Sequence, residues 1–412
     1  MYLVTPNYLF TSKGFVTQHS FVFDQKILWM GKTEELPQNY QNIDELKLPK
    51  FSCIIPGLIN SHVHLEFSAN KSSLKYGRFL PWLYSVIDKR DDLVTECKED
   101  CVKEAIKSMI NTGTTAFGAV SSYGAEMGAC IDTPAKVVFF NELIGSNAVM
   151  ADALWGDFMG RLGDSKKFLS DSFKPAIAIH SPYAVHPVLV KKAVSLAVNE
   201  NLPLTAHLLE SDAERQWLTE NEGDFKPFFK DLLQQERAVT SIEEFISSFD
   251  KQATLFTHAT KLTDTEAELL SDKGHAVIHC PISNRLLGNG VLDLEKLYKH
   301  NINYVCGTDG LSSNYSLDLF EELKSALYMH NSADLDTLAL SLLHSVTTVA
   351  GEHLGLNCGK LETGFDADFL LFDLENELSH EEDLALHIIL KNFPLKSVHI
   401  NGENQKETYA QD

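Results

Sequence analysis

The chain has 412 residues, of which 44% are hydrophobic and 22% are charged, as is ordinary for a globular enzyme. Its formal net charge of −22 excludes the basic surface that non-specific nucleic-acid binding needs. No apolar stretch reaches the roughly 18 residues of a membrane-spanning helix, and the first residues lack the pattern of a signal peptide. The 7 cysteines are scattered and form no Cys-x-x-Cys pair. We therefore expect a cytoplasmic enzyme that binds neither nucleic acid nor membrane.

Both ends of the chain carry short strand-like runs, for example Phe21–Phe23 and Phe369–Phe372. The region between them alternates strand and helix patterns. Two β-rich ends that fold together would form one small sheet structure. We therefore predict a small β-sandwich domain of residues 1–56 and 356–412, and a central domain of residues 57–355.

The central region contains eight apolar runs that are continuous, as expected for parallel strands covered on both faces. They are Ile54–Ile59, Thr114–Phe117, Lys136–Phe140, Ala176–Ile179, Leu204–His207, Thr254–His258, Ala276–His279 and Tyr304–Gly307. Helical patterns such as Lys98–Asn111 and Val188–Asn199 lie between them. Eight such units predict an α/β fold of the (β/α)8 TIM-barrel type. A doubly wound open sheet is the alternative, but no Gly-x-Gly-x-x-Gly and no P-loop support it.

Polar residues follow six of the eight predicted strands. His62-Val63-His64 sends two imidazoles to one face, because side chains alternate along a strand. A single histidine after an apolar run is more often a core residue than a ligand. The prediction of a metal site therefore depends on the whole set of strand-end residues. The other strand ends carry His180, His207 with Glu210, His258, His279 and Asp309. In a TIM barrel these ends meet at one rim, which predicts a site built on imidazole, a preferred ligand of zinc.

With these motifs the chain resembles the amidohydrolase superfamily, and within it the mononuclear branch that deaminates purines and related rings. The matching segments are Pro56-Gly57-Leu58-Ile59-Asn60-Ser61-His62-Val63-His64, His207-Leu208-Leu209-Glu210, His258, His279-Cys280-Pro281-Ile282-Ser283-Asn284, Gly307-Thr308-Asp309 and Gly364-Phe365-Asp366-Ala367-Asp368. The resemblance implies that His62, His64, His207 and Asp309 bind one divalent metal per chain, Zn²⁺ with Fe²⁺ as the alternative. Binuclear members carry a carboxylated lysine after the fourth strand, where this chain has His180 and no lysine nearby.

The resemblance also implies a hydrolytic deamination. Glu210 would protonate a ring nitrogen, while His258 and Asp309 would take and orient the proton of the attacking water. A solvated loop carboxylate is the alternative for Glu210, but the His-x-x-Glu spacing disfavours it.

The implied substrate is a small molecule, an adenine nucleoside with a 5′ extension. Trp82 would pack against the nucleoside or lie in the core, Asp88 would bind ribose hydroxyls, and His180 would also contact the substrate. The sequence is most similar to the 6-amino-6-deoxyfutalosine deaminases of ε-proteobacterial menaquinone synthesis, whose substrate has a 5′ arm ending in a benzoate. We predict that Arg285 binds that carboxylate through a bidentate pair, with Arg78 and Arg215 as substitutes and a surface ion pair as the alternative.

Other activities share these ligands. Deaminases of S-adenosylhomocysteine, methylthioadenosine or adenosine are the nearest alternative, followed by guanine or cytosine deaminases, dechlorinating relatives and imidazolonepropionase-type hydrolases. A catalytically silent scaffold is an alternative of another class, and the complete set of ligand and acid residues disfavours it. The oligomeric state stays open, with a homo-oligomer among the options.

Overall fold

The centre of the molecule is an eight-stranded parallel sheet in which each strand pairs with the next along the chain. The structure is a computed structural model that describes residues 1–271 and 273–406. The strands are β8 (Leu58–Val63), β9 (Thr114–Ser121), β10 (Lys136–Leu143), β11 (Phe173–Ile179), β12 (Leu204–Leu208), β13 (Leu255–His258), β14 (Ala276–His279) and β15 (Asn303–Cys306). After β15 the Asp309 N–H donates to the carbonyl of His62 on β8 at 3.0 Å, which brings the two edges together. This near-closed barrel confirms the TIM-type fold and excludes the open sheet.

The barrel strands are apolar on both faces because they separate an inner core from an outer one. In β10, Val138 and Phe140 belong to the cluster inside the barrel, whereas Val137 and Phe139 pack into the outer cluster against the helices. This alternation is the period of two that every strand imposes.

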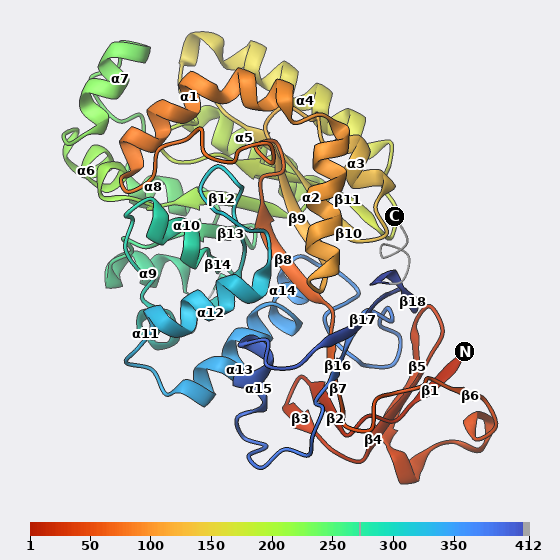
Figure 1. The fold of residues 1–412 in the computed structure, drawn as a ribbon. Coiled ribbons are helices and arrows are strands. Elements are labelled where there is room, and N and C mark those ends of the chain that lie inside the picture. The colour runs from red at the N-terminus through yellow and green to blue at the C-terminus, as the bar shows by residue number, and fades with distance from the viewer. Residues whose placement is uncertain (272, 407–412) are drawn as a thin grey trace.

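Helices surround the barrel (Figure 1). They are α1 (Phe79–Glu96), α2 (Glu99–Asn111), α3 (Met127–Asp132), α4 (Ala151–Lys166), α5 (Pro187–Glu200), α6 (Asp212–Glu220), α7 (Phe225–Leu233), α8 (Ile242–Ser247), α9 (Asp264–Leu270), α10 (Pro281–Leu286), α11 (Leu294–Lys299), α12 (Leu319–Met329), α13 (Leu335–Ser345) and α14 (Thr348–His353). The expected helices over Lys98–Asn111 and Val188–Asn199 are α2 and α5, each within one residue of its predicted ends. Pro187 occupies the first turn of α5, where its missing N–H has no cost.

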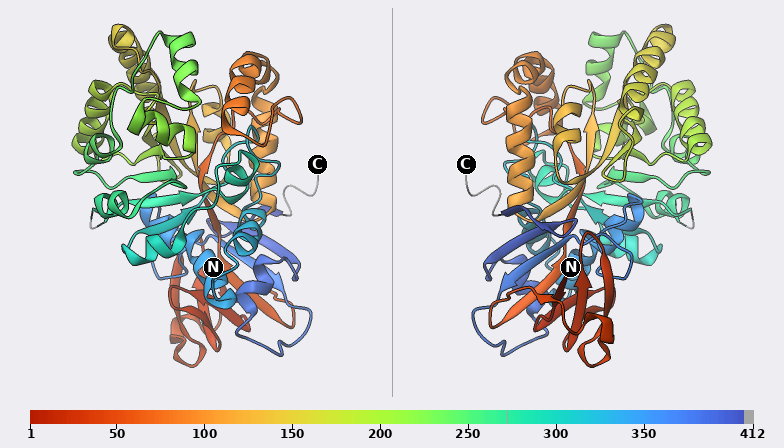
Figure 2. Two further views of the ribbon diagram at one scale, coloured as in Figure 1. Left: turned by 90° about the vertical axis from the view of Figure 1, so that its left-hand side faces the viewer. Right: turned by 90° about the vertical axis from the view of Figure 1, so that its right-hand side faces the viewer.

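The two chain ends form two further sheets below the barrel, seen in red and blue in Figure 2. The four-stranded sheet has the order β5 (Ile27–Lys32), β4 (His19–Phe23), β1 (Tyr2–Val4), β6 (Asp44–Glu45). The six-stranded sheet has the order β18 (Glu403–Asn404), β17 (Leu395–Ile400), β16 (Phe369–Asp373), β7 (Ser52–Pro56), β2 (Tyr8–Thr11), β3 (Gly14–Val16), and α15 (Leu384–Ile389) connects β16 to β17. Phe21 and Phe369 come from different sheets and meet in one apolar cluster at a ring distance of 5.4 Å. The chain ends therefore form a sandwich.

The predicted strand Ile54–Ile59 is wrong in one respect, because it is divided between two sheets. β7 ends at Pro56 in the six-stranded sheet, and β8 begins the barrel at Leu58. Gly57 makes the crossing, where a Cβ would lie 2.1 Å from Thr115 Oγ1. We propose that the domain boundary lies here and near residue 356, as the sequence predicts.

A buried ion pair joins the barrel to the terminal sheets. Lys136 opens β10, and its Nζ donates to both carboxylate oxygens of Asp368 at 2.8 and 2.6 Å and to Asn401 Oδ1 at 2.9 Å. The Asn401 N–H also donates to Asp368 at 2.8 Å. The late Gly364–Asp368 motif therefore has a structural use, since its last residue holds the base of the barrel.

Among residues 1–271 and 273–406, no helix has the length and apolar character that crossing a membrane requires.

Candidate active site

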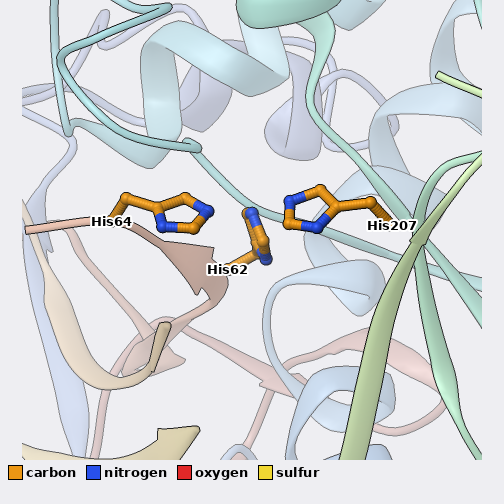
Figure 3. A group of neighbouring side chains, drawn as sticks. All are labelled: His62, His64 and His207. Carbon is orange, nitrogen blue, oxygen red and sulfur yellow. The ribbon is translucent and has the colours of Figure 1, made fainter. Parts of the chain in front are cut away.

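Three imidazoles converge at the carboxyl ends of the barrel strands (Figure 3). His62 lies on β8, His64 follows it directly, and His207 lies on β12. One ligand nitrogen of each ring lies within 4.8 Å of the other two, and all three side chains are buried. The predicted histidine ligands thus share one point, with a spacing suited to a single ion.

The surroundings of His64 and His207 favour the neutral form that metal binding requires. Burial, followed by the neighbouring His62, lowers the pKa of His64 to about 4 and takes the pKa of His207 well below its usual value. Neutral imidazoles offer a free lone pair. His207 Nδ1 donates to the carbonyl of His180 at 2.7 Å, which leaves its Nε2 for a ligand. The buried Nε2 of His62 has no hydrogen-bond partner among the described residues, a costly omission unless an ion fills it.

Asp309 completes this set. Its Oδ1 lies 3.6 Å from His62 Nε2 and 3.8 Å from His64 Nε2. These separations are too long for hydrogen bonds. They approach the roughly 3.3 Å expected between tetrahedral ligands on arms of about 2.0 Å. Burial alone would raise the pKa of Asp309, but His62 and His64 outweigh burial and hold that pKa well below its usual value. The residues present therefore fit a divalent metal.

Two hydroxyls hold the other oxygen of Asp309. Ser283 Oγ and Ser313 Oγ each donate to Oδ2 at 2.8 Å. Asp309 has a φ of +55° and His258 one of +74°, a left-handed backbone that costs residues with a Cβ about 1–3 kcal/mol. Such conformations persist where the surrounding structure determines them, and here they occur at two predicted site residues.

Glu210 and His258 face each other beside Asp309. His258 Nε2 lies 3.6 Å from Glu210 Oε1 and 4.0 Å from Asp309 Oδ2. Burial, then the carboxylates of Asp309 and Glu214, raise the pKa of Glu210 well above its usual value, which favours its protonated form. Burial lowers the pKa of His258 to about 4. The pair thus consists of a carboxylic acid and a neutral base.

The orientation of this pair comes from two amides. His258 Nδ1 donates to Asn284 Oδ1 at 2.9 Å, which leaves Nε2 as the acceptor toward the site. Asn289 Nδ2 donates to Glu210 Oε1 at 3.1 Å. Ser283 and Asn284 thus position Asp309 and His258 from one short helix, α10.

His180 lies beside this centre and is bound to Glu142. Its Nδ1 is 2.6 Å from Glu142 Oε1, and Ser122 Oγ donates to Glu142 Oε2 at 2.6 Å. Burial lowers the pKa of His180, but Glu142 outweighs it and raises that pKa above its usual value. Glu142, His180 and His207 form a second group with metal-ligand spacing. In that group, His180 Nδ1 and Glu142 Oε1 already bond to each other. In the three-histidine group, His62 Nε2 has no partner among the described residues.

A pocket extends from these residues along α1. His64, His207, Glu210, His258 and Asp309 line its inner end, together with His180 and Glu142. Trp82 lines it, and its Nε1 donates to the carbonyl of Ser312 at 2.8 Å. Asp88 does not line the pocket, and its side chain is 73% exposed. The reason is its position around the helix. Asp88 follows Trp82 by six residues, which turns its side chain by roughly 240° from the direction of Trp82.

The predicted carboxylate-binding arginines lie elsewhere. Arg285 is exposed on α10 and is not among the pocket residues. Arg215 donates to both oxygens of Glu266 at 3.0 Å, and Arg78 pairs with Asp224 at 3.2 Å on the surface. Arg78 therefore forms the surface ion pair that was the alternative to carboxylate binding.

Sequence reasoning did not identify Glu142, although the signal was present. It ended the third strand at Phe140, whereas β10 continues to Leu143 and carries Glu142 near its carboxyl end. His279, which sequence reasoning placed at the rim, is buried and faces His330, with 3.1 Å between the Nε2 atoms. Asn289 follows α10 in a loop, and no spacing rule connects it with Glu210.

The comparison with known proteins identifies the class. The Amidohydrolase family model matches residues 53–404, and the chain therefore belongs to the amidohydrolase family. This confirms the resemblance seen in the motifs.

Particular relatives narrow the comparison. The chain is 44% identical over 403 residues to the aminodeoxyfutalosine deaminase of a Nitratiruptor species, covering 98% of this chain and 99% of that one. It is 30% identical over 391 residues to an adenosine deaminase of Helicobacter pylori, covering 93% and 94%. A crystal structure of Helicobacter pylori aminofutalosine deaminase in complex with methylthio-coformycin superposes with a TM-score of 0.91 at 28% identity, covering 98% of this chain and all of that one.

Proposed function

We propose that this protein is a metal-dependent deaminase that converts 6-amino-6-deoxyfutalosine and water to futalosine and ammonia, as a step of menaquinone biosynthesis. Identity of 44% over nearly the whole chain to an aminodeoxyfutalosine deaminase supports the substrate. The protonated Glu210, held beside His258 and the three-histidine cluster, carries the proposal for the chemistry. The cytoplasmic location and a homo-oligomeric state stay predictions from the sequence.

The proposed metal ligands are His62, His64, His207 and Asp309. Three imidazoles and one carboxylate are a donor set typical of Zn²⁺, with Fe²⁺ as the alternative. When bound, such an ion supplies the Lewis acidity that makes a water molecule nucleophilic near neutral pH. Ser283 and Ser313 hold Asp309 Oδ2, so that Oδ1 faces the histidines.

The chain's own residues move the protons. Glu210 donates its proton to the ring nitrogen next to the amino-bearing carbon, which makes that carbon electrophilic. His258 Nε2 accepts a proton from the attacking water while its Nδ1 stays bound to Asn284. A carbon–oxygen bond forms, and His258 passes the proton it accepted to the amino group. The carbon–nitrogen bond then breaks to release ammonia, and the remaining proton of the former water returns to Glu210 as the carbonyl forms. Trp82 and His180, which both line the pocket, would contact the nucleoside.

A panel of nucleosides tests the substrate. Ammonia release is measured with 6-amino-6-deoxyfutalosine, methylthioadenosine, S-adenosylhomocysteine and adenosine. We expect the highest kcat/KM for 6-amino-6-deoxyfutalosine. A preference for one of the other three would overturn the substrate assignment but retain the deaminase, and adenosine is the alternative that the Helicobacter pylori relative favours.

Metal removal tests the chemistry. Dialysis against a chelator should abolish ammonia release, and one equivalent of Zn²⁺ per chain should restore it. Full activity of a metal-free preparation would contradict the proposed mechanism.

A further inference from the structure

One face of α1 forms a wall of the pocket. Positions that line it follow the spacing i, i+3, i+4, i+7, i+8 and i+11, which is a single stripe along a helix. These residues are Phe79, Trp82, Leu83, Val86, Ile87 and Arg90. The stripe is apolar until its last member, which is a cation.

The charge of the pocket changes from its inner end to its mouth. Asp309, Glu210 and Glu142 lie at the inner end, where Asp309 is only 7% exposed. Among the lysines and arginines of the described chain, Arg90 is the one that lines this pocket. Its side chain is 46% exposed, which places it at the mouth.

The contacts of Arg90 leave its guanidinium ready for a ligand. Its Nε contacts Asp91 at 3.4 Å, but Asp91 is itself 92% exposed and holds it weakly. The guanidinium carbon lies 5.6 Å from the ring centre of Tyr123, which orients the group over the pocket rim. The two terminal nitrogens have no hydrogen-bond partner within the described residues. They form the fork that binds a carboxylate in a bidentate way.

Arg90 lies far enough along α1 from the inner end of the pocket to suit an extended ligand. Trp82 bonds to Ser312, three residues after Asp309, and so marks the inner part of the stripe. Arg90 follows eight residues later, which is roughly 12 Å along the helix axis. Between them the wall is made of Leu83, Val86 and Ile87, and Ile144 also lines the pocket. An apolar arm would pack along this wall and bring a terminal carboxylate to Arg90.

We infer that Arg90 determines substrate specificity by binding the carboxylate at the end of the 5′ arm. The inference rests on the proposed function, because it assigns the residue that reads the benzoate of that substrate. It replaces Arg285, the residue predicted from the sequence. The role is in substrate selection, since Arg90 is remote from the reacting atoms.

Arg90→Met tests the inference with two substrates that differ only in charge, 6-amino-6-deoxyfutalosine and its carboxamide. We expect the ratio of their kcat/KM values to fall by about tenfold or more in the variant, the effect of losing a charge-assisted hydrogen bond. Arg90→Lys should lose part of this ratio, because a lysine keeps the charge without the fork. The ratio should also fall in the unmodified protein as salt is added, since the site is half exposed.

Lys89→Met is the matched control. Lys89 precedes Arg90, its side chain is also 46% exposed, and it does not line the pocket. Its substitution should leave the ratio within twofold of the original. An unchanged ratio in Arg90→Met, or a larger change in Arg285→Met, would overturn the inference. Failure of the unsubstituted protein to deaminate 6-amino-6-deoxyfutalosine would instead overturn the proposed function.

Discussion

Two buried polar sites at opposite ends of the barrel differ in how their groups are satisfied. At the base, Lys136 is buried with its ammonium bound to Asp368 and Asn401. At the pocket end, His62 Nε2 is buried without a partner in the described chain, and Asp309 and His258 have left-handed backbones. A satisfied pair holds two parts of a fold together, whereas open and strained groups are kept where a ligand will satisfy them. The difference separates a structural contact from a site that is open to a ligand.

The largest effect is expected at the pocket end of the barrel, from Glu210→Gln. Glutamine keeps the shape of the side chain but cannot supply an acidic proton. We expect kcat to fall by about 10³-fold, within the range for a lost general acid. Metal content and Tm should stay as in the original protein, which separates a chemical loss from misfolding. A kcat within tenfold of the original would assign the proton donation to another group.

At the base, Lys136→Met should lower stability and leave chemistry alone. Removing the ammonium leaves Asp368 buried without its counter-charge, which costs about 3–5 kcal/mol. The midpoint of urea unfolding measures this loss. The kcat/KM of the folded protein should not change, because the pair lies at the opposite end of the barrel from the pocket.

The control for that variant is Lys103→Met. Lys103 pairs with Glu99 on the surface of α2, so its substitution should leave the urea midpoint unchanged. Equal shifts of the urea midpoint in Lys136→Met and Lys103→Met would show that the buried Lys136–Asp368 pair adds no particular stability.

A smaller effect is expected from Ser283→Ala. The variant removes one of two hydroxyls that hold Asp309 Oδ2, while Ser313 remains. Loss of a residue that hydrogen-bonds to a metal ligand lowers metal affinity by about 10- to 100-fold. We expect a loss of about tenfold here, because Ser313 remains. Competition with a chelator measures the affinity. Ser345→Ala removes another buried hydroxyl, one that contacts Cys306 away from the site, and should leave the affinity unchanged.

The smallest effect is expected from Asp88→Asn. Asp88 points away from the pocket, so kcat/KM should change by less than about twofold, as for an exposed substitution without a buried partner. A tenfold loss would support the ribose contact predicted from the sequence. It would also mean that α1 turns a different face to the substrate than the structure shows.

The strand ends explain why so much of the site could be predicted. In a parallel barrel, the residue after each apolar run lies on the same rim, so His62, His207, His258 and Asp309 could be grouped from their order alone. The same rule would have found Glu142 if the third strand had been drawn to its true end at Leu143. Residues outside the strands follow no such rule, so the predicted roles of Arg285 and Asp88 had no comparable support, and neither residue lines the pocket.

The sequence by itself determined the barrel, because strand periodicity is a local property of the chain. Its motifs, through their resemblance to a family, also predicted the metal-ligand set and the acid of the reaction. Only the tertiary structure decided which side chains face each other. It joined Ser283 to Asp309, Asn284 to His258 and Lys136 to Asp368. It also placed Arg90 rather than Arg285 beside the pocket. These pairings depend on helix phase and on contacts between segments far apart in the chain, which no local pattern encodes.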